Sequence, residues 1–460
     1  MTDGPRLRFS PAPTGYLHVG SARSALFNWL AARHAGGQLL LRVEDTNAEL
    51  YKPEYLDSIL VTLDWLGIGF DEEPVFQSQR ADRYAAATQE LLDGGFAYYC
   101  DCTPEAVKER TAGNATPGYD GFCRDRKVAP GPNAAVRFNV PDEGTLAFDD
   151  IVRGRVEFEL AALTDFVIQR ANGTATFYLP NAVDDVDMGI THVVRGEDLI
   201  NVTPNVLLIR QALGNDERPA FAHLPLIVNA QRKKLSKRRD DVSVEDFRAR
   251  GYLPEAFRNY LAVLGWGPKD GVEVRPIEEI VEQFALEDVV SSPAFFDSQK
   301  LDHFNGEYIR ALDTAEFTQR VDGWLPPEWD RSRFEKVAPL VQERIKKLDE
   351  APEMVDFLFL SEVVIDDDSW QKAVAKLPQA AAVLDAALER YATADWNASA
   401  LHELTAAIAE EHDLKLGKAQ GPIRVAVTGR SVGPPLFESL EVLGRDVTLA
   451  RLRTARERLG

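Results

Sequence analysis

Hydrophobic and polar positions in the first 95 residues alternate between a strand-like and a helix-like pattern. A β-type stretch at 7–10 ends at two prolines and Gly15, and apolar residues then recur at helical spacing from about residue 22. Two further helices are expected at 53–66 and 81–92. This alternation predicts the first half of a nucleotide-binding α/β domain.

The pattern changes twice after that first segment. From 96 to 180 it consists of loops and short strands, which predicts an inserted α+β module, and the α/β pattern then resumes until a basic run at 233–239. Helical periodicity dominates after residue 240. The expected elements are strands at 135–140, 155–160 and 165–169, a further segment of the α/β pattern at 224–229, and helices at 203–213, 254–264, 334–348, 380–391 and 399–411.

Two short motifs about two hundred residues apart point to a nucleotide phosphate. His18 and Gly20 stand at the expected start of a helix, where free N–H groups suit an anion and a glycine leaves room for a flat base or ribose. In the second motif, Lys234 and Lys237 supply mobile positive charge and Ser236 a hydroxyl group. Alone, the first motif is usually a turn and the second a solvated basic face, so their combination is what indicates a nucleotide.

Charge and composition limit the class of protein. A net charge of −21 argues against a nucleic-acid partner, but 232–239 hold six basic and no acidic residues, and 415–460 hold nine Lys or Arg against four Asp or Glu. An RNA could use these patches, with salt-sensitive binding. The chain of 460 residues allows two to four domains, and it has no apolar leader and no apolar run near the length of a membrane span. We expect a cytoplasmic protein without a membrane segment.

All three cysteines lie between residues 100 and 123. Cys100 and Cys102 are two residues apart and can face one metal ion, and Cys123 follows a loop rich in Gly, Asn and Pro that can fold back towards them. An odd, clustered set is not a disulfide framework. The sequence is therefore compatible with a structural zinc site, and the alternative is three reduced thiols without a metal.

The two phosphate motifs together resemble the HIGH and KMSKS signatures of class I aminoacyl-tRNA synthetases, here His18-Val-Gly-Ser21 and Lys234-Leu-Ser-Lys-Arg238. Further strings are similar to those of the bacterial glutamyl-tRNA synthetase family, so that the resemblance runs from about residue 6 to the C-terminus. These strings are Leu41-Arg-Val-Glu-Asp-Thr46, Asn181-Ala-Val-Asp-Asp185, His192-Val-Val-Arg-Gly-Glu-Asp198, Arg424-Val-Ala-Val-Thr-Gly429 and Gly433-Pro-Pro-Leu-Phe-Glu438.

The resemblance implies a multidomain α/β plus all-α fold. A Rossmann-type catalytic domain, split by an α+β insertion, is expected to precede helical anticodon-binding domains. Glutaminyl enzymes carry β-barrels in that last part, so the helical pattern favours a glutamyl enzyme. The expected parts are the catalytic halves at 1–95 and 181–240, an inserted acceptor-end-binding module at 96–180, a helical stem-contact domain at 241–310 and a helical anticodon-binding region at 311–460.

The activity implied is glutamate–tRNA ligation. ATP with Mg²⁺ would activate L-glutamate to glutamyl-adenylate, and the glutamyl group would pass to the 3′-terminal adenosine of tRNA(Glu), with tRNA(Gln) as an open second acceptor; we expect a monomer. Other functions considered are glutamylation of a modified tRNA base, small-molecule nucleotidyl transfer and non-catalytic RNA binding. The helical third argues against the first two, and intact His18, Glu44, Arg195 and Lys237 argue against the last.

Site roles follow from the resemblance together with charge. Arg8 and Arg195 are candidates for a glutamate carboxylate and Glu44 for the ammonium group, although a structural ion pair is the alternative for Arg195 and Glu44. His18 and Lys237 are expected to neutralise charge that develops on the phosphates. The remaining assignments are Ser10, Tyr178 and Asn181 to glutamate, Gly20, Asp198, Lys234, Leu235 and Ser236 to ATP, and Arg344 to the anticodon.

Three positions depart from the family pattern. The family string Ala-Pro-Ser-Pro reads Ser10-Pro-Ala12-Pro here, so the hydroxyl group has moved by two residues along the same face of a strand. Phe177 stands where Tyr is common. In the cysteine region many relatives end in Cys-x-His, whereas this chain has Asp125, and Tyr119 is the alternative fourth zinc ligand. The alternative to an anticodon role for Arg344 is that of a surface arginine on a helix.

Overall fold

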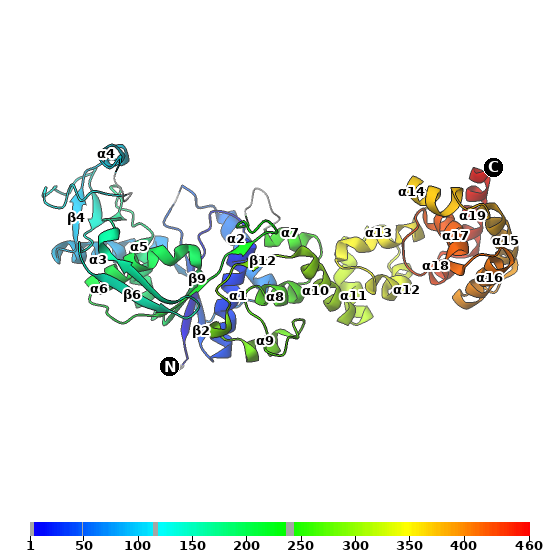
Figure 1. Cartoon of the computed structure of the whole chain (residues 1–460), viewed down its shortest axis with the longest axis horizontal. Helices are drawn as coiled ribbons and strands as arrows, with labels where there is room; N and C mark the ends of the chain where they lie inside the picture. Colours follow the sequence, from blue (N-terminus) through cyan, green and yellow to red (C-terminus); the bar gives the residue numbers. More distant parts are fainter. Residues whose placement is uncertain (1–3, 48, 114–117, 236–242) are drawn as a thin grey trace. The chain divides into compact units, whose positions relative to one another are not determined.

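The computed structural model describes residues 4–47, 49–113, 118–235 and 243–460. The chain separates into two compact units, Met1–Arg248 with Pro254–Ser298, and Ala249–Leu253 with Gln299–Gly460 (Figure 1). The five-part division expected from the sequence stays a prediction. Within the described ranges, no helix is both long and apolar enough to cross a bilayer.

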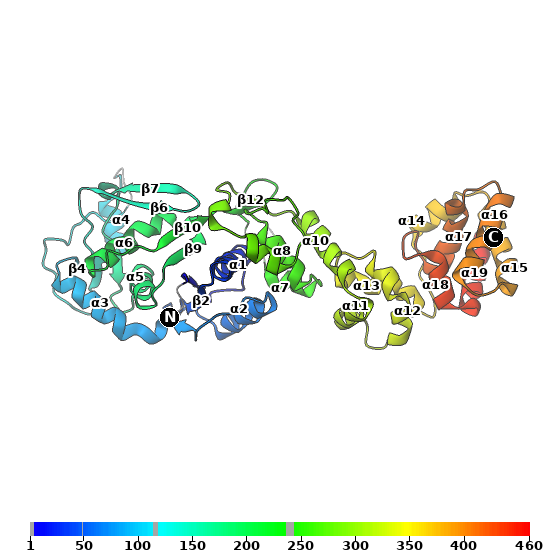
Figure 2. The same cartoon turned by 90° about the horizontal axis from the view of Figure 1, so that it is seen from below.

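The first unit is built on a seven-stranded sheet in the order β3-β2-β1-β9-β10-β6-β7 (Figure 1, Figure 2). The first six strands in this order are parallel, and β7 pairs antiparallel with β6. The bounds are β1 (Arg6–Phe9), β2 (Gln38–Val43), β3 (Val75–Phe76), β6 (Thr145–Asp150), β7 (Gly154–Glu159), β9 (His192–Gly196) and β10 (Ala220–Leu224). The predicted α/β fold with a parallel sheet is confirmed.

The strand order reverses in the middle of this sheet. From β1 the sheet continues through β2 and β3 on one side, whereas β9 and β10 extend it on the other side. In parallel sheets a reversal of this kind leaves room for a ligand beyond the carboxyl ends of the strands that flank it. The topology therefore predicts a ligand site beyond the ends of β1 and β9.

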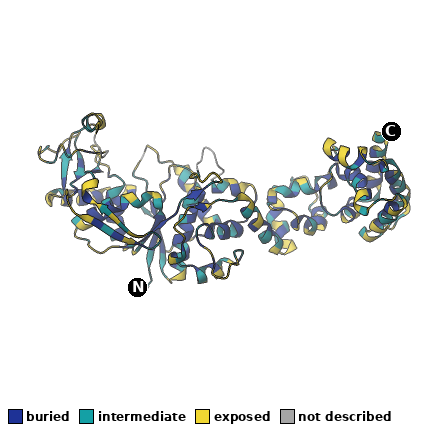
Figure 3. Cartoon of the chain, in the orientation of Figure 1, coloured by how far each residue is buried: buried dark blue, intermediate teal, exposed yellow. Residues whose placement is uncertain are grey.

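Helices of the first unit pack around the large sheet, and the buried positions gather between these layers (Figure 3). Helix α1 (Val19–His34) follows β1 and packs against β1 and β9, which places its N-terminus near the carboxyl edge of the sheet. Helices α5 and α6 pack on each other and share one core with the sheet. The other bounds are α2 (Pro53–Trp65), α3 (Ala81–Asp93), α4 (Pro104–Arg110), α5 (Tyr178–Asp187), α6 (Thr203–Ala212), α7 (Val244–Ala249), α8 (Pro254–Ala262) and α9 (Ile277–Gln283).

The strands between residues 96 and 180 divide between two sheets. Strands β4 (Ala97–Cys100), β5 (Ala135–Phe138) and β8 (Val167–Gln169) form a separate antiparallel sheet. The β6–β7 hairpin instead extends the large sheet beside β10, where the ring centroid of Phe148 lies 5.1 Å from that of Phe221. The segment expected as one inserted module thus contributes strands to two sheets, and its status as a separate module stays a prediction.

Two expected elements differ from the structure. The expected segment at 224–229 divides next to Pro225, which cannot donate to a ladder, so that β10 ends at Leu224 and β11 (Ile227–Val228) pairs with β12 (Ala294–Phe295). The helix expected at 334–348 is α12 (Arg331–Gln342), which leaves the segment after residue 342 in a turn. The other expected elements are present with ends shifted by a few residues.

The second unit is entirely helical, as the periodicity predicts (Figure 1). Helix α15 packs against α16, α17 and α19. Gly429 ends α17 in the left-handed region (φ 81°), and a Cβ there would collide with the carbonyl oxygen of Val364, which explains a glycine at the end of that string. The remaining bounds are α10 (Ser298–Ala311), α11 (Thr314–Val321), α13 (Ala351–Val355), α14 (Asp367–Trp370), α15 (Ala380–Thr393), α16 (Ala398–Glu411), α17 (Leu416–Thr428), α18 (Leu436–Leu443) and α19 (Arg445–Leu459).

Candidate active site

A cavity of about 490 Å³ lies at the carboxyl ends of β1, β9 and β10, where the reversal of strand order predicts a ligand site. The N-terminus of α1 and the segment after β11 complete its wall. Most residues predicted for substrate binding line it, namely Arg8, Ser10, His18, Gly20, Glu44, Asn181, Arg195, Asp198, Lys234 and Leu235. The fold thus gathers positions from distant parts of the first unit around one space.

His18 caps the first turn of α1. Its Nδ1 accepts hydrogen bonds from the backbone N–H groups of Gly20 (3.0 Å) and Ser21 (3.2 Å), so the neutral ring carries its proton on Nε2, 3.1 Å from the Ser21 hydroxyl. A Cβ on Gly20 would lie 2.9 Å from Cε1 of this ring. The backbone N–H groups of Gly20 and Ser21 are therefore not free, as the sequence predicts, but bonded to the ring of His18, which also lies beside Gly20. The role of Gly20 in the nucleotide site stays a prediction.

Ser10 directly follows β1 and lines the cavity, whereas Ala12 is exposed and does not. The Ser10 hydroxyl oxygen is buried and has no hydrogen-bond partner among the residues that the structure describes. A buried hydroxyl without a partner costs free energy, which a polar ligand in the cavity would recover. The hydroxyl group at position 10 therefore points to the site in spite of its shift along the sequence.

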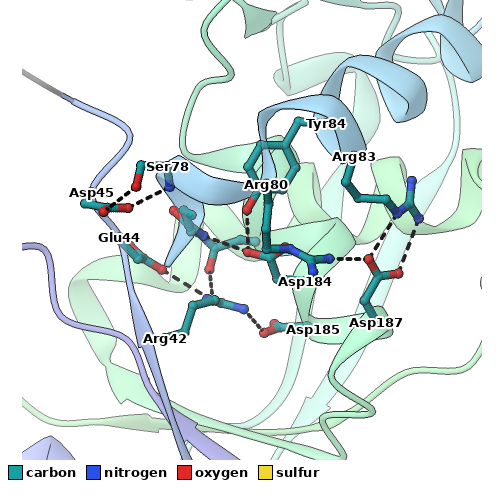
Figure 4. Close-up of polar contacts among 12 residues, drawn as sticks. Arg42, Glu44, Asp45, Ser78, Arg80, Arg83, Tyr84, Asp184, Asp185 and Asp187 are labelled. Atoms are coloured by element: carbon teal, nitrogen blue, oxygen red, sulfur yellow. Dashed lines mark hydrogen bonds and ion pairs between the residues drawn. The ribbon is translucent and has the colours of Figure 1, made fainter. Parts of the chain in front are cut away.

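A buried ion network stands beside the cavity (Figure 4). Arg42 of β2 donates hydrogen bonds to Asp185 (2.5 Å) and to Asn181 (2.7 Å), and its Nη2 also lies 3.3 Å from Glu44. Arg8 donates to the same Asp185 oxygen (3.0 Å). Burial opposes ionisation of Asp185, but the charges of Arg8 and Arg42 hold its pKa well below the ordinary value. The pKa of Glu44 is raised, because burial outweighs the attraction of Arg42.

The neighbouring Asp184 forms a second buried centre in the same network (Figure 4). It accepts hydrogen bonds from Arg80 (2.8 Å), Tyr84 (2.8 Å) and Gln77 (3.1 Å), and thereby ties α5 to α3 and to the turn before it. Burial, and then the charge of Asp184, raises the pKa of Tyr84. The adjacent acidic residues of α5 thus fix the position of the helix that carries Asn181.

Sequence reasoning missed these partners, although it quoted the strings that contain them. Arg42 stands inside an otherwise apolar buried strand, and Asp185 lies on a helix 143 positions later in the chain. A charge within an apolar run is the signal that could have marked each residue, because buried charges in proteins are paired. Only the fold identifies which two are partners.

Arg195 enters the cavity from β9 with a different set of partners. Its Nε donates to His223 Nε2 (3.2 Å), and its Nη2 donates to the Thr203 hydroxyl (2.8 Å) and to the carbonyl oxygen of Leu199 (3.3 Å). Burial, and then the charge of Arg8, lowers the pKa of Arg195 to about 10, which leaves it protonated at neutral pH. Its contacts are not those of the structural ion pair considered as an alternative.

Phe177 lines the cavity, whereas Tyr178 does not. Tyr178 is the first residue of α5, and its ring packs in the core with its centroid 4.8 Å from that of Phe166. The expectation that Tyr178 contacts glutamate is corrected accordingly. Asn181 is held at both ends of its amide, by Arg42 and by the carbonyl oxygen of Phe177 (2.9 Å).

The segment after β11 contributes charge at the mouth of the cavity. Lys234 Nζ lies 2.9 Å from Asp198 Oδ2, and both side chains are more than half exposed, so this pair can open for a ligand at little cost. The backbone N–H of Leu235 donates to the carbonyl oxygen of Ile227 (3.1 Å). Ser236 and Lys237 lie outside the described residues, and their roles stay predictions.

Arg344 lies in the second unit, exposed, in the turn beyond α12 rather than on the predicted helix. Its Nη1 is 3.4 Å from the carbonyl oxygen of Leu340. Burial, and then the nearby charge of Arg344, lowers the pKa of Arg424. The anticodon role of Arg344 stays a prediction.

The three cysteines form one cluster, in which the sulfur atoms of Cys100, Cys102 and Cys123 lie within 4.8 Å of one another. The hydroxyl oxygen of Tyr119 is 3.5 Å from Cys100 Sγ and 3.9 Å from Cys102 Sγ. Tetrahedral ligands about 2.3 Å from zinc are roughly 3.8 Å apart, so these four atoms fit a zinc ion. Asp125 is exposed and is not part of the cluster. Each sulfur accepts a hydrogen bond from an arginine: Cys100 from Arg137, Cys102 from Arg110 and Cys123 from Arg126.

Comparison with known proteins covers the whole chain. Residues 6–303 match the family model for the catalytic domain of class I tRNA synthetases (E and Q), and residues 316–456 match an anticodon binding domain. A glutamate–tRNA ligase of Frankia casuarinae is 55% identical over 99% of this chain and 98% of its own length. The ligase of Thermobifida fusca is 53% identical over 100% of this chain and 99% of its own length.

A solved structure agrees with these matches. The crystal structure of a glutamate tRNA ligase from Elizabethkingia meningosepticum, in complex with its amino acid, superposes with a TM-score of 0.87 at 29% identity and covers 100% of both chains. The parallel sheet and the helical second unit are thus those expected from the sequence resemblance. The chain belongs to the class I tRNA synthetases of the glutamate and glutamine type.

Proposed function

We propose that this protein is a glutamate–tRNA ligase that charges tRNA(Glu). The observation that carries the proposal is the cavity at the switch point, which holds the carboxyl group of Glu44, His18 at a helix N-terminus, and Arg195 with no acidic partner among the described residues. These groups complement the side-chain carboxylate, the ammonium group and the phosphates of the two substrates. The full-length relatives named glutamate–tRNA ligase support the same assignment.

The reaction needs positioning and charge neutralisation rather than a covalent nucleophile. A carboxylate oxygen of glutamate attacks the α-phosphorus of ATP, the bond to the β-phosphate breaks, and pyrophosphate leaves. A ribose hydroxyl of the terminal adenosine then attacks the acyl carbon of the adenylate, loses its proton, and AMP leaves. Mg²⁺ neutralises phosphate oxygens, and because no carboxylate cluster for it occurs among the described residues, we assign its coordination mainly to ATP.

Glutamate is assigned to the inner part of the cavity. Arg195 offers the guanidinium group for a carboxylate, and Arg8, whose charge is shared with Asp185, adds to the positive field. Glu44 is assigned to the ammonium group, and Ser10 supplies a hydroxyl that lacks any other partner. Asn181 and Arg42 hold this arrangement in shape.

ATP is assigned to the side bordered by α1 and the segment after β11. The ring of His18 has its proton on Nε2 and can donate it in a hydrogen bond to a phosphate oxygen. Asp198 is assigned to the ribose, with Gly20, Lys234, Leu235 and the outlying Ser236 and Lys237 completing the nucleotide site. The exposed Lys234–Asp198 pair would exchange partners when ATP binds.

The first test is aminoacylation with radiolabelled glutamate, ATP and Mg²⁺, using separately transcribed glutamate and glutamine tRNAs as acceptors. We expect tRNA(Glu) to be charged with glutamate, and not to be charged when glutamine replaces glutamate as the amino acid. Charging of tRNA(Gln) as well would make the protein the first step of an indirect route to glutaminyl-tRNA. Folded protein that charges neither tRNA contradicts the proposal.

Arg344 is assigned to the anticodon, where it would help to exclude tRNA(Gln). Its exposure beside a second arginine suits an RNA base or phosphate. Arg344→Ala should lower the ratio of kcat/KM for tRNA(Glu) over tRNA(Gln), whereas Lys346→Ala, an equally exposed neighbour, should leave that ratio unchanged. Equal ratios in both variants would refute the assignment.

Lys237 is assigned to the leaving pyrophosphate. Lys237→Ala should reduce adenylate formation, measured as ATP–pyrophosphate exchange with tRNA present, by orders of magnitude, while tRNA binding in a filter assay persists. Lys233→Ala, in the same basic run but not on the cavity wall, serves as the control. Equal loss of exchange and of tRNA binding would contradict this role.

The cysteine cluster is assigned to a structural zinc ion with Tyr119 as the fourth ligand. An arginine donates a hydrogen bond to each of the three sulfurs, an arrangement that suits the negative charge of sulfur ligands on a zinc ion. Elemental analysis of the purified protein should give about one zinc per chain, less in Cys102→Ser and Tyr119→Phe, and the wild-type value in Asp125→Ala. Loss of zinc in Asp125→Ala would show that Asp125, and not Tyr119, is the fourth ligand. Wild-type protein without zinc would show that the cysteines are three reduced thiols.

We further assign a monomer that works in the cytoplasm, the compartment of translation. The helical second unit and the cavity of the first are each complete within one chain. Sedimentation of the protein should give one species near 51.1 kDa. A species of twice that mass would contradict the monomer.

A further inference from the structure

Among the residues that the structure describes, only neutral groups hold Arg195. Its Nε and Nη2 donate to a histidine ring, a hydroxyl group and a backbone carbonyl, and no described residue accepts a hydrogen bond from its Nη1. Arg8, in the same cavity, is bound instead to the carboxylate of Asp185. The Nη1 edge of Arg195, with its full charge, is therefore left for a ligand, and the other edge determines how the guanidinium group is turned.

That other edge rests on a row of three polar side chains that crosses the sheet. Asp150 ends β6, His223 lies on β10 and Arg195 lies on β9, and the parallel pairing places His223 directly beside Arg195. His223 is 0% exposed, and Asp150 and Arg195 are also buried. The row runs from the edge of the β6–β7 hairpin to the wall of the cavity.

The hydrogen bonds along this row run in one direction. Asp150 accepts from the backbone N–H groups of Val152 (3.0 Å) and Arg153 (2.9 Å) and from that of His223 (3.1 Å), which anchors its carboxylate. The ring of His223 then donates from Nδ1 to Asp150 (2.6 Å). Its Nε2 is left as an acceptor, and Nε of Arg195 donates to it (3.2 Å). With the opposite tautomer, two N–H groups would face each other.

We propose that His223, locked in this tautomer by Asp150, is a positioning residue that orients Arg195 towards the carboxylate of the amino acid, with Thr203 as the second fixed acceptor. The inference rests on the proposed function, in which Arg195 binds glutamate. Because the three acceptors are neutral, they fix the direction of the guanidinium group without consuming its charge. Neither His223 nor Thr203 lines the cavity.

The test uses two variants that divide the functions of the ring. In His223→Asn the amide NH₂ can replace Nδ1–H towards Asp150 but offers Arg195 no acceptor, whereas in His223→Gln the longer side chain places an amide oxygen near the position of Nε2. Aminoacylation of tRNA(Glu) is measured with glutamate and ATP varied in turn. His223→Asn should raise the KM for glutamate about tenfold, the cost of one charged hydrogen bond, with the KM for ATP within about twofold. His223→Gln should recover most of the loss.

The alternatives are separable. The positioning role is overturned if folded His223→Asn raises both KM values in parallel, or if it leaves the KM for glutamate unchanged. It is also overturned if His223→Gln shows the same defect as His223→Asn. If His223→Asn does not fold, Thr203→Val decides: a selective rise in glutamate KM supports the role and an unchanged KM overturns it. Arg195→Gln is measured beside them, because an unchanged glutamate KM there would instead contradict the proposed role of Arg195.

Discussion

Two buried arginines at the same edge of the sheet have opposite kinds of hydrogen-bond partners. Arg42 on β2 donates to the carboxylates of Asp185 and Glu44, whereas Arg195 on β9 donates to neutral groups only. The pKa of Arg42 is raised, since its acidic partners outweigh burial, and the pKa of Arg195 is lowered to about 10 by burial and then by the charge of Arg8. A compensated charge fixes the shape of the site, and an uncompensated one remains for a ligand.

The difference follows from what each arginine can reach. Arg42 faces α5, where Asp185 and Asn181 accept its hydrogen bonds. Arg195 faces β10 and the start of α6, which present a ring nitrogen and a hydroxyl group. Burial of a cation without a counter-ion is costly, and function rather than stability accounts for such an arrangement at a cavity wall.

Removal of the shared carboxylate should have the largest effect. Asp185→Asn leaves Arg8 and Arg42 buried without their common counter-ion, and loss of one partner of a buried pair typically costs about 3–5 kcal/mol. We expect the urea midpoint of the variant to fall sharply, or the protein to be insoluble. An unchanged urea midpoint would contradict the structural role of the charges around Asp185.

A matched control separates burial from charge number. Asp187 also pairs with two arginines, Arg80 and Arg83, but all three side chains are partly exposed. Asp187→Asn should therefore cost less than about 1 kcal/mol, as surface ion pairs do. Equal losses in Asp185→Asn and Asp187→Asn would show that burial is not what distinguishes the network beside the cavity.

Arg195→Gln should give the converse result, a functional loss without a stability loss. Removal of a charged hydrogen-bond pair with the substrate carboxylate should lower kcat/KM for glutamate about 100-fold, or about 2.7 kcal/mol. The urea midpoint should stay at the wild-type value or rise, because no carboxylate in the protein loses its partner. A destabilised variant would place Arg195 with Arg42 as a structural charge.

The sequence predicts the positions on the cavity wall better than the contacts behind them. Arg8, His18 and Arg195 belong to motifs at strand ends or helix starts, and in a parallel sheet such positions meet at one edge whatever the details of packing. The pairing of Asp150 with His223, by contrast, depends on a hairpin that joins the large sheet. Local patterning does not reveal that partner choice.

Two other differences have similar causes. Tyr178 is polar at one end and stood next to the family's usual tyrosine position, yet its backbone place at the start of α5 turns the ring onto Phe166. Arg344 continues a helical periodicity in the sequence, but α12 ends at Gln342 and a turn follows. The first difference depends on the register of one residue on a helix and the second on where a helix ends, and periodicity alone sets both only approximately.

The neutral ring beside Arg195 should also make stability depend on pH. Burial holds the pKa of His223 below its ordinary value of about 6.5. The hydrogen bond to Asp150 opposes this shift, and the charge of Arg195 adds to it. Below that pH the unfolded chain binds a proton that the folded protein does not, so stability should fall with falling pH by up to about 1.4 kcal/mol per unit. His223→Gln should have a shallower slope between about pH 7 and 5, with a residual part from His192, whose pKa burial also lowers. Identical slopes would mean that His223 is charged in the folded state.

The smallest effect is expected at Ser10, where the same logic applies to a neutral group. Its hydroxyl oxygen is buried without a partner among the described residues, so Ser10→Ala should stabilise the protein by up to about 1 kcal/mol while the KM for glutamate rises several-fold. Ser24→Ala is the control, because that hydroxyl lines the cavity too but already donates to the carbonyl oxygen of Gly20 (3.1 Å). A destabilised Ser10→Ala would indicate a structural partner for the hydroxyl. A stabilised variant with an unchanged KM would show that an unpartnered polar group on this wall does not by itself indicate ligand binding. That result would also weaken the inference that Arg195 binds a ligand.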